Sequence, residues 1–265
     1  MQSWITESYQ IWLVLIVSGA LAGFLNAFLG LGGMSIYVPL LIYILHTELG
    51  DRTQLISTVL INSFSVVVIV GLASWISDHS HKTIHYRKVP PLTSGATCGV
   101  IFGFSIAILT GLFGSMDLIF GFYLIAIGIF SLLQKIESAP HMHSYRNLFG
   151  IGLAGGALGA FAGFAGNSVF IPLLRDNGLN IKESIATAQL IGLEVAALMV
   201  LLIGMTFSFH NIHAGACIAL AISGFGGSYL GGRLKKLISG SYINLALVIS
   251  YWITGGLLVY RHSNF

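Results

Sequence analysis

The sequence GLGGMSIYVPLL, at Gly30–Leu41, lies near the middle of an apolar run, Ile11–Leu45, that contains no charged residue. Three glycines and a proline at the centre of such a run are unexpected in a plain membrane helix, because both residue types weaken a helix interior. A related sequence, GFAGNSVFIPLL, stands at Gly163–Leu174. The fold is therefore decided by how an apolar segment is interrupted by glycines at two places in the chain.

The composition is that of an integral membrane protein. Of the 265 residues, 55% are hydrophobic and only 8% are charged, and the mean hydropathy is +0.88, whereas about a quarter of the residues of a soluble domain are charged. We expect one membrane domain, 1–265, with no removable signal peptide. Six further apolar windows are predicted to cross the roughly 30 Å hydrocarbon layer as helices: 55–76, 89–112, 118–133, 185–207, 214–232 and 243–260.

The two glycine-rich sequences belong to a longer internal repeat. A shift of 133 positions aligns Gly19–Leu41 with Gly152–Leu174, and 11 of the 23 aligned residues are identical. TQLI at 53–56 is matched by AQLI at 188–191, and small residues at every fourth position, which let membrane helices pack closely, occur in both halves. We therefore predict two repeats, about 9–134 and 148–262, joined by a linker at about 135–147.

The basic residues indicate how the two repeats are oriented. If each glycine-rich segment crosses the membrane once, the basic residues divide six against six between the two sides. If each segment enters and leaves on one side, ten share a side and only Arg52 and Arg261 lie opposite, as the positive-inside tendency favours. After its glycines the second copy has only about seven apolar residues, Ser168–Leu174, too few to cross.

The predicted fold is therefore an all-α integral membrane protein of two inverted repeats. Each repeat has a glycine-rich re-entrant helical hairpin and about three transmembrane helices, and both chain termini lie outside the cytoplasm. In the first hairpin, Ile36–Val38 are expected to be extended because Pro39 follows them, and the returning half-helix is expected to begin between Ser35 and Pro39. Glycine packing alone is the simpler alternative, but it does not explain the matched order of glycine, serine and proline.

Two half-helix N-termini near the membrane centre would present free N–H groups and positive dipole ends, which bind anions, as in many secondary transporters. The polar faces of the helices that follow are expected to line the same cavity, since polar groups in a membrane need partners or water. Interhelical hydrogen bonding is the alternative for these faces. The candidate substrate-binding residues are Gly32, Gly33, Met34, Ser35, Ala165, Gly166, Asn167 and Ser168 at the tips, and Gln54, Thr58, Asn62 and Gln189 on the helices.

Glu194 is a carboxylate about nine residues inside a predicted span. A protonated glutamate at this depth could bind and release a proton during transport, which makes Glu194 a candidate for proton coupling. The alternative is a carboxyl group that donates a hydrogen bond to a carbonyl of a neighbouring helix.

Two histidine clusters, His79–His85 and His141–His143, suggest a different function, a divalent-metal permease. A solvated basic loop is the alternative for both. The chain has no GxSxG, HExxH or GxxxxGK[ST] motif, so we expect no enzyme, no cofactor and no metal. A passive anion channel and a membrane assembly protein without substrate also remain open.

Duplicated glycine-rich segments ending in PLL, each followed by a polar-faced helix, resemble the sulfite exporter TauE/SafE family of bacterial membrane permeases. The resemblance covers nearly the whole chain and implies transport of a small sulfur-containing anion, such as sulfite or an organosulfonate, through the inner (plasma) membrane without ATP hydrolysis in the same chain, by a permease or exporter whose direction of transport is open. The expected partners are this anion and the lipid bilayer, with no nucleic acid; the oligomeric state is open, with a homodimer as one option. The family tip is typically GxGGG; here Met34, Ala165 and Asn167 stand at glycine positions, and the apolar Met34 would suit a ligand with a carbon or sulfur end.

Overall fold

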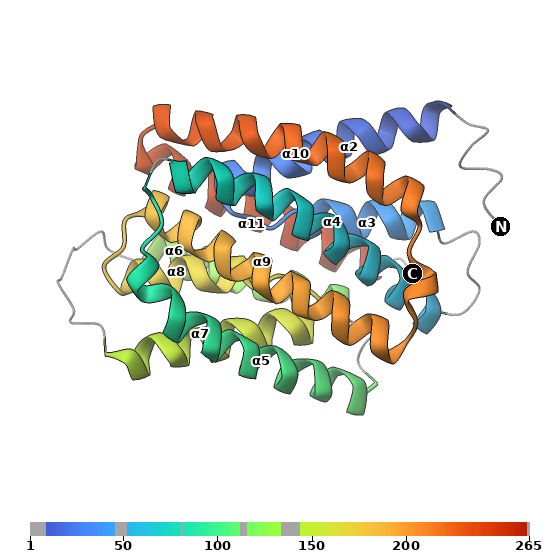
Figure 1. Cartoon of the computed structure of the whole chain (residues 1–265), viewed down its shortest axis with the longest axis horizontal. Coiled ribbons are helices and arrows are strands. Elements are labelled where there is room, and N and C mark those ends of the chain that lie inside the picture. The colour runs from blue at the N-terminus through green and yellow to red at the C-terminus, as the bar shows by residue number, and fades with distance from the viewer. Residues whose placement is uncertain (1–8, 46–51, 81, 112–115, 134–143, 264–265) are drawn as a thin grey trace.

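The computed structural model describes residues 9–45, 52–80, 82–111, 116–133 and 144–263, and within them the chain is entirely helical, without strands (Figure 1). The predicted all-helical fold is confirmed. Two short 3₁₀ turns, Tyr86–Lys88 and Phe209–Asn211, accompany ten α-helices. These are α2 (Tyr9–Leu29), α3 (Met34–Leu45), α4 (Arg52–Ser80), α5 (Val89–Leu109), α6 (Met116–Leu133), α7 (Tyr145–Ala162), α8 (Asn167–Asp176), α9 (Ile181–Thr206), α10 (Ala214–Leu237) and α11 (Gly240–Ser263).

Each of the six predicted windows coincides with a helix to within a few residues: α4, α5, α6, α9, α10 and α11. By length and composition five helices in the described residues can cross a membrane, namely Tyr9–Leu29, Gln54–Ser80, Tyr86–Leu109, Ile181–Thr206 and Ala214–Leu237. The first of these, α2, was not counted as a span in the sequence analysis. Helices α3 and α8 have only 12 and 10 residues, about 18 and 15 Å of helix, so neither can cross alone.

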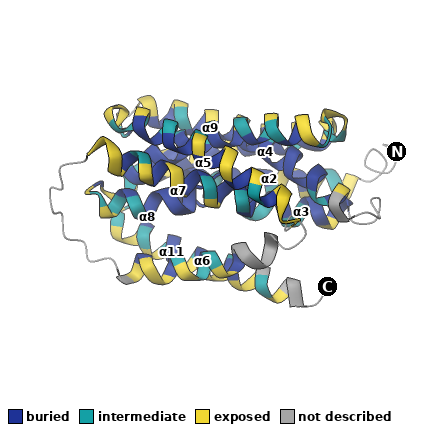
Figure 2. Ribbon diagram, turned by 90° about the horizontal axis from the view of Figure 1, so that it is seen from below, coloured by how far each residue is buried: buried dark blue, intermediate teal, exposed yellow. Residues whose placement is uncertain are grey.

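The outer surface is apolar, as expected for a protein surrounded by lipid. Exposed residues on the outward faces include Leu13 on α2, Ile222 and Leu230 on α10, and Trp252 and Leu257 on α11. Figure 2 shows that buried residues concentrate where the helices face one another, and exposed residues on the outer sides. A surface this rich in exposed large hydrophobic side chains is unfavourable in water.

Two pairs of helices pack most closely, α2 with α10 and α5 with α7, while α4 packs on α9 and α6 on α11. Glycines permit the close approach: a Cβ at Gly99 of α5 would collide with the Leu153 carbonyl oxygen of α7, and one at Gly227 of α10 with the Ala20 carbonyl oxygen of α2. The small-residue ladders identified in the sequence therefore lie at helix contacts, where backbones approach closely. The first half of the chain thus packs its helices against the second half.

Two neighbouring glycines of α7 provide a test of this packing. A Cβ at Gly152 would collide with the Leu92 carbonyl oxygen of α5, whereas one at Gly150 meets nothing within 4 Å. We expect Gly152→Ala to destabilise the protein by about 1–3 kcal/mol through overpacking, and Gly150→Ala to leave stability unchanged or slightly improved because alanine favours helix. Thermal unfolding of both variants in detergent measures the difference, and equal melting temperatures would contradict the observed α5–α7 contact.

Candidate functional site

Two short glycine-containing connections stand out in the fold: the first link, residues 30–33 between α2 and α3, and the second link, residues 163–166 between α7 and α8. Positive φ angles occur at Gly30 (75°) and Gly32 (71°) in the first link and at Gly163 and Gly166 (both 75°) in the second. These angles are easily adopted only by glycine. In Figure 1, α3 runs back toward the end of the molecule where α2 begins, and α8 runs back toward the opposite end, where α7 begins.

Helix α3 begins at Met34, one residue before the predicted range, and contains Pro39 in its sixth position. The prediction that Ile36–Val38 are extended is wrong. A proline so near the helix start removes only one intrahelical hydrogen bond, and burial of Tyr37, Val38 and Leu41 in the core outweighs the local bias that a following proline imposes. Helix α8 repeats this arrangement, with Pro172 in its sixth position.

The two links touch each other inside the molecule. A Cβ at Gly32 would lie 3.9 Å from Nδ2 of Asn167, and one at Gly30 would collide with the Ile171 side chain of α8. Of the predicted tip residues, Ser35 is half-buried, and the others are buried: Gly32, Gly33, Met34, Ala165, Gly166, Asn167 and Ser168. The structure therefore brings together the two segments that the sequence repeat singled out.

Three buried amide side chains surround this contact, and we call them the amide cluster: Asn26 of α2, Asn167 of α8 and Gln189 of α9. Gln189 Nε2 donates a hydrogen bond to the Asn26 carbonyl oxygen, and Asn167 lies directly against Gly192, less than one turn along α9 from Gln189. All three side-chain oxygens lack a hydrogen-bond partner among the described residues. Buried amides without partners are unfavourable, so the cluster is a place where a polar ligand or water would be stabilised.

Asn26 was not predicted from the sequence as a site residue. A single buried amide in the otherwise apolar α2 was the available signal, because a polar side chain in a membrane helix is unfavourable unless it faces a partner. The residue of the second repeat that aligns with Asn26 is Gly159, so the alignment of the two repeats shows no shared amide at this position.

The two repeat-related serines have different neighbours. Ser35 Oγ donates to the Gly32 carbonyl oxygen at 3.2 Å and so holds the first link in shape. Ser168 instead lines the smaller recess described below together with Tyr123 of α6. Tyr123 was also missed by sequence reasoning, since nothing along the chain connects α6 to the second link.

The polar residues predicted on α4 are not at the links. Gln54 is exposed in the first turn of α4, and Thr58 is buried one turn further on. Asn62 is fully buried, and its Nδ2 donates to the carbonyl oxygens of Thr58 (2.6 Å) and Asn211 (2.8 Å). Its Oδ1 accepts from the His213 N–H (2.7 Å) and the Cys217 thiol (3.0 Å). Asn62 is therefore saturated with partners and holds the connection between α9 and α10 against α4, as the interhelical alternative supposed.

Glu194 is half-buried on α9, where its Oε1 accepts a hydrogen bond from Thr97 Oγ1 of α5 at 2.9 Å. This partner is a hydroxyl donor and not the helix carbonyl that the alternative interpretation required. A hydroxyl can bond either the neutral or the ionised carboxyl group, so the contact is compatible with a change of protonation.

The histidines have local partners. His79 Nδ1 lies 2.5 Å from the Tyr86 hydroxyl, and His85 Nε2 lies 3.2 Å from Glu183 Oε1. Among the described residues there is no group of three or more His, Cys, Asp or Glu side chains that could hold a metal ion. His81, His141 and His143 lie outside the described residues.

A buried ion pair was also missed. Lys235 of α10 is 1% exposed, and its Nζ lies 2.9 Å from each carboxylate oxygen of Asp78 on α4. From the sequence, Lys235 was counted only as one of the ten basic residues on one side of the membrane, and its burial in the last turn of α10 was not predicted. The two residues are 157 positions apart, so no local pattern could pair them, and each charge is tolerated inside the protein because the other is present.

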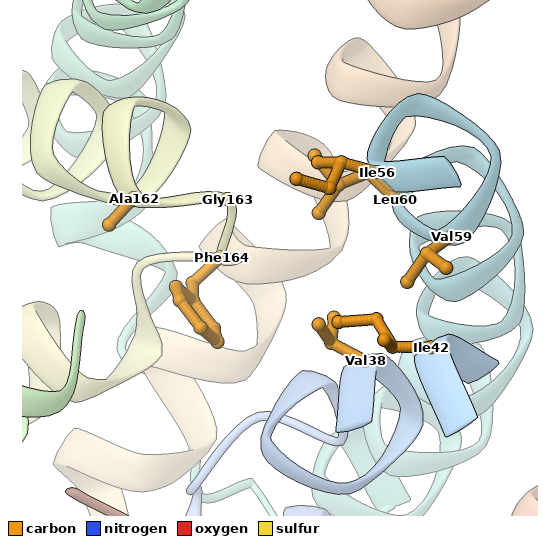
Figure 3. Close-up of a pocket in the computed structure, with 8 residues that line it drawn as sticks. All are labelled: Val38, Ile42, Ile56, Val59, Leu60, Ala162, Gly163 and Phe164. Atoms are coloured by element: carbon orange, nitrogen blue, oxygen red, sulfur yellow. The ribbon is translucent and has the colours of Figure 1, made fainter. Parts of the chain in front are cut away.

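Two recesses flank the second link. The larger, with about 310 Å³ of empty volume including its open part, is lined by side chains of α3, α4 and the second link (Figure 3). Its lining residues are Val38, Ile42, Ile56, Val59, Leu60, Ala162, Gly163 and Phe164. The smaller is a tight crevice whose empty volume of about 170 Å³ includes its open part, and its lining includes Tyr123, Gly166 and Ser168. Ala162 and Phe164 line both recesses, so these two residues lie between them.

Comparison with known proteins gives a family match. Residues 15–258 match the family model described as Sulfite exporter TauE/SafE. A probable membrane transporter protein of Haemophilus influenzae is 29% identical over 187 residues, which cover 68% of this chain and 69% of the relative. The probable membrane transporter protein YunE of Bacillus subtilis is 27% identical over 258 residues, with 86% of this chain and 88% of the relative covered.

The bonds of Asn62 generate a prediction. Asn62→Ala leaves the Asn211 carbonyl and the His213 N–H without their partner, so we expect a loss of about 1–3 kcal/mol in the free energy of unfolding, with unchanged ligand affinity. Ser65→Ala is the control, because the Ser65 hydroxyl bonds only its own helix, at the Ile61 carbonyl oxygen, and its removal should have little effect. Denaturant unfolding in detergent makes the measurement; reduced ligand affinity in Asn62→Ala at unchanged stability would return Asn62 to the substrate site.

Proposed function

The chain belongs to the sulfite exporter TauE/SafE family of membrane transporters, and we propose that it carries a small sulfur-containing anion, sulfite or an organosulfonate, past the contact between its two links. The resemblance drawn from the sequence is confirmed, and as a member of a transporter family the protein is not an enzyme. The observation that carries the proposal is the amide cluster. Three buried amides without side-chain oxygen partners, at the meeting point of two broken helices, are otherwise difficult to explain in a membrane interior.

The chemistry of this place suits an oxyanion. An amide can present its NH₂ group as well as its oxygen after a rotation of the side chain, and Ser168 adds a hydroxyl that can donate, whereas the Ser35 hydroxyl donates within the first link. Helices α3 and α8 both begin at the links, so their first-turn N–H groups and positive dipole ends lie there. No side chain caps the N-terminus of α8, whose cap residue is Gly166. These hydrogen-bond donors are uncharged, so they bind the anion less strongly than a cation would and allow the transporter to release it.

We propose further that the chain consists of two inverted repeats, about 9–134 and 148–262, within a single membrane domain. Exchanging α2–α6 for α7–α11 maps the packing of the molecule onto itself. Under this exchange, the α2–α10 contact corresponds to the α7–α5 contact, and the α3–α4 contact corresponds to the α8–α9 contact. The α4–α9 and α6–α11 contacts are each mapped onto themselves. In Figure 1 α2 and α7 run in opposite directions, as inversion requires. The pairs α2–α3 and α7–α8 are then re-entrant hairpins, in which α3 and α8 are the half-length returning arms.

We propose that the protein lies in the inner membrane with both termini outside the cytoplasm. In this orientation most of the basic residues lie on the cytoplasmic side, as the positive-inside tendency favours. We propose that the two recesses lined by Ala162 and Phe164 serve as half-paths to the substrate site. Alternating access rocks one repeat against the other, so that Phe164 leaves one recess open at a time.

The other functions considered from the sequence have less support. A membrane assembly protein without substrate needs no unpartnered amides at its centre. A metal permease would need the histidine loops, of which the described members bond to Tyr86 and Glu183. A passive channel uses the same site and is distinguished by flux alone, because only a transporter can accumulate its substrate against a gradient.

Two asparagines at opposite ends of α8 test the site. Asn167 lies at the links and its side-chain oxygen has no partner, whereas Asn177, just after α8, donates to the Leu173 carbonyl oxygen at 2.8 Å. We expect Asn167→Ala to raise the Kd for sulfite about fivefold or more, as the loss of one hydrogen bond of about 1 kcal/mol implies. Asn177→Ala, the matched control, should bind sulfite as the unmodified protein does.

Isothermal titration calorimetry with the purified full chain measures both values. An unchanged Kd in Asn167→Ala, in a protein that does bind sulfite, would remove the site from the links.

Proton coupling at Glu194 is a separate proposal with its own test. We expect Glu194→Gln to abolish sulfite accumulation driven by a pH gradient in proteoliposomes, while exchange of labelled for unlabelled sulfite continues, because glutamine keeps the shape but carries no titratable proton. Thr97→Val is the control: it removes the hydroxyl that bonds Glu194 and keeps the carboxyl group. Undiminished uphill accumulation by Glu194→Gln would exclude Glu194 as the coupling residue.

A further inference from the structure

We propose that the contact between α4 and α10 is an entrance by which the anion reaches the first link, and that Lys235 binds the anion there in place of Asp78. This inference rests on the proposed anion transport, and it gives a role to residues that neither the sequence repeat nor the family match singles out. Helix α4 belongs to the first half of the chain and α10 to the second, so rocking of the halves would open this contact. The name polar seam refers below to Tyr37, Ser74, Ser77, Asp78, Ser228 and Lys235.

The outer part of the polar seam lies where α4 and α10 end side by side (Figure 1). Here the Lys235 ammonium nitrogen lies 2.9 Å from each carboxylate oxygen of Asp78, and both side chains are almost fully buried. Next to this pair, a Cβ at Gly232 of α10 would collide with Ser77 Oγ, so the Ser77 hydroxyl is directed at α10. Ser77 is 3% exposed, and its hydroxyl has no hydrogen-bond partner among the described residues.

The polar seam continues inward through two serines. Ser74 Oγ and Ser228 Oγ lie 2.7 Å apart, and Ser228 Oγ donates to the Val70 carbonyl oxygen at 3.2 Å. One turn further along α10, a Cβ at Gly224 would collide with the Val70 side chain and with the Tyr37 hydroxyl. The seam therefore ends at the hydroxyl of Tyr37, a fully buried residue of α3 whose hydroxyl also has no partner in the described part of the chain.

Tyr37 connects the polar seam to the first link. Its ring lies against Gly33, where a Cβ would collide with it, and the preceding residue, Gly32, lies beside Asn167 of the second link. Close helix packing explains the small residues of the seam, but two buried hydroxyls without partners are unfavourable in a dry contact. The seam reaches the first link, whereas the two recesses border the second, so it adds a route that the recesses do not provide.

The charges at the outer end of the polar seam favour an anion. Lys182 of α9 donates a hydrogen bond from Nζ to the Lys236 carbonyl oxygen at 3.0 Å, next to Lys235. The ammonium nitrogen of Lys236 is buried and has no partner among the residues that the structure describes. Three lysines thus lie in or beside the last turn of α10, and within the described residues Asp78 is the one carboxylate that pairs with any of them. Such a surplus of positive charge raises the local concentration of anions.

An ion pair suits a contact that opens to water. The attraction between two buried charges is largely offset by the loss of their hydration, so their separation costs little once water reaches both of them. An apolar contact regains no such hydration when it opens. The corresponding ends of α5 and α9, residues 104–109 and 200–206, contain no charged residue, so the equivalent contact of the other repeat lacks this pair. An anion that enters the open seam can take the place of Asp78 beside Lys235.

The experiment measures how fast a cysteine in the polar seam reacts with two thiol reagents of opposite charge. Ser228→Cys is made in the full-length chain with Cys98→Ser and Cys217→Ser, and the detergent-purified protein is treated with 2-sulfonatoethyl methanethiosulfonate or 2-(trimethylammonio)ethyl methanethiosulfonate. Each rate is divided by the rate of the same reagent with 2-mercaptoethanol. We expect the anionic reagent to react about fivefold faster or more, because the surplus lysine charge attracts it. Asp78→Asn should increase this preference, and Lys235→Met should reverse it.

Ser131→Cys is the matched control. Ser131 is also buried with an unpartnered hydroxyl, but it lies on α6, which packs mainly on α11, so we expect slow reaction with both reagents and no preference for either charge. If Asp78→Asn or Lys235→Met fails to fold, Lys236→Met keeps the ion pair and should slow the anionic reagent while speeding the cationic one.

Three results would overturn the entrance and leave anion transport by another route standing. They are no reaction of Ser228→Cys with either reagent, an equal rise of both rates in Asp78→Asn, as a loosened fold would give, and an unchanged ratio of the two rates in Lys236→Met. Absence of sulfite transport by the unmodified protein in proteoliposomes would instead overturn the proposed function, and this entrance with it.

Discussion

The contact between the two glycine links is the feature on which the rest of the structure depends. A helix that breaks inside a membrane exposes backbone N–H and C=O groups, and these groups are tolerated there only where protein or a polar cavity surrounds them. Here each link is buried against the other and against α9, with Gly32 beside Asn167 and Gly30 beside Ile171. Close helix packing through glycines in α2, α5, α7 and α10 encloses this region, and the apolar outer faces of the helices meet the lipid. The two breaks thus bring two helix N-termini and three buried amides close together, as the proposed anion site requires.

The two halves share a plan but differ at the site. Ser35 bonds within its own link, whereas Ser168 lines a recess together with Tyr123. Tyr37 occupies the position of Phe170, and Arg175 that of Ile42. The packing of helices is nearly symmetric under exchange of the halves, because each helix contact needs only small or apolar residues. The proposed anion binding needs specific polar atoms, and these are not repeated between the halves: Asn26 corresponds to Gly159 and Asn167 to Met34.

Much of the fold was predictable from the sequence, and much of the site was not. The six apolar windows, the glycine ladders and the two links follow from patterns along the chain, since length and apolarity suffice to define a membrane helix. The extended conformation expected for Ile36–Val38 was wrong because core burial outweighed a local bias. The placement of Asn62 and Lys235 depends on partners far away in the sequence, Asp78 for Lys235 and the α9–α10 connection for Asn62. A polar stripe on a helix identifies residues that need partners, but it does not say whether the partner is another helix or a substrate.

The most direct test of the central claim, that a sulfur-containing anion binds inside this protein, is the melting temperature of the unmodified, detergent-purified chain with sulfite, taurine, acetate, chloride or zinc. A ligand that binds only the folded state, present at a hundred times its dissociation constant, adds about 2.7 kcal/mol to the stability, and such a shift is readily measured. The account predicts that sulfite, taurine or both raise the melting temperature and that acetate, chloride and zinc do not. Stabilisation by zinc alone, or by none of the anions, would contradict it.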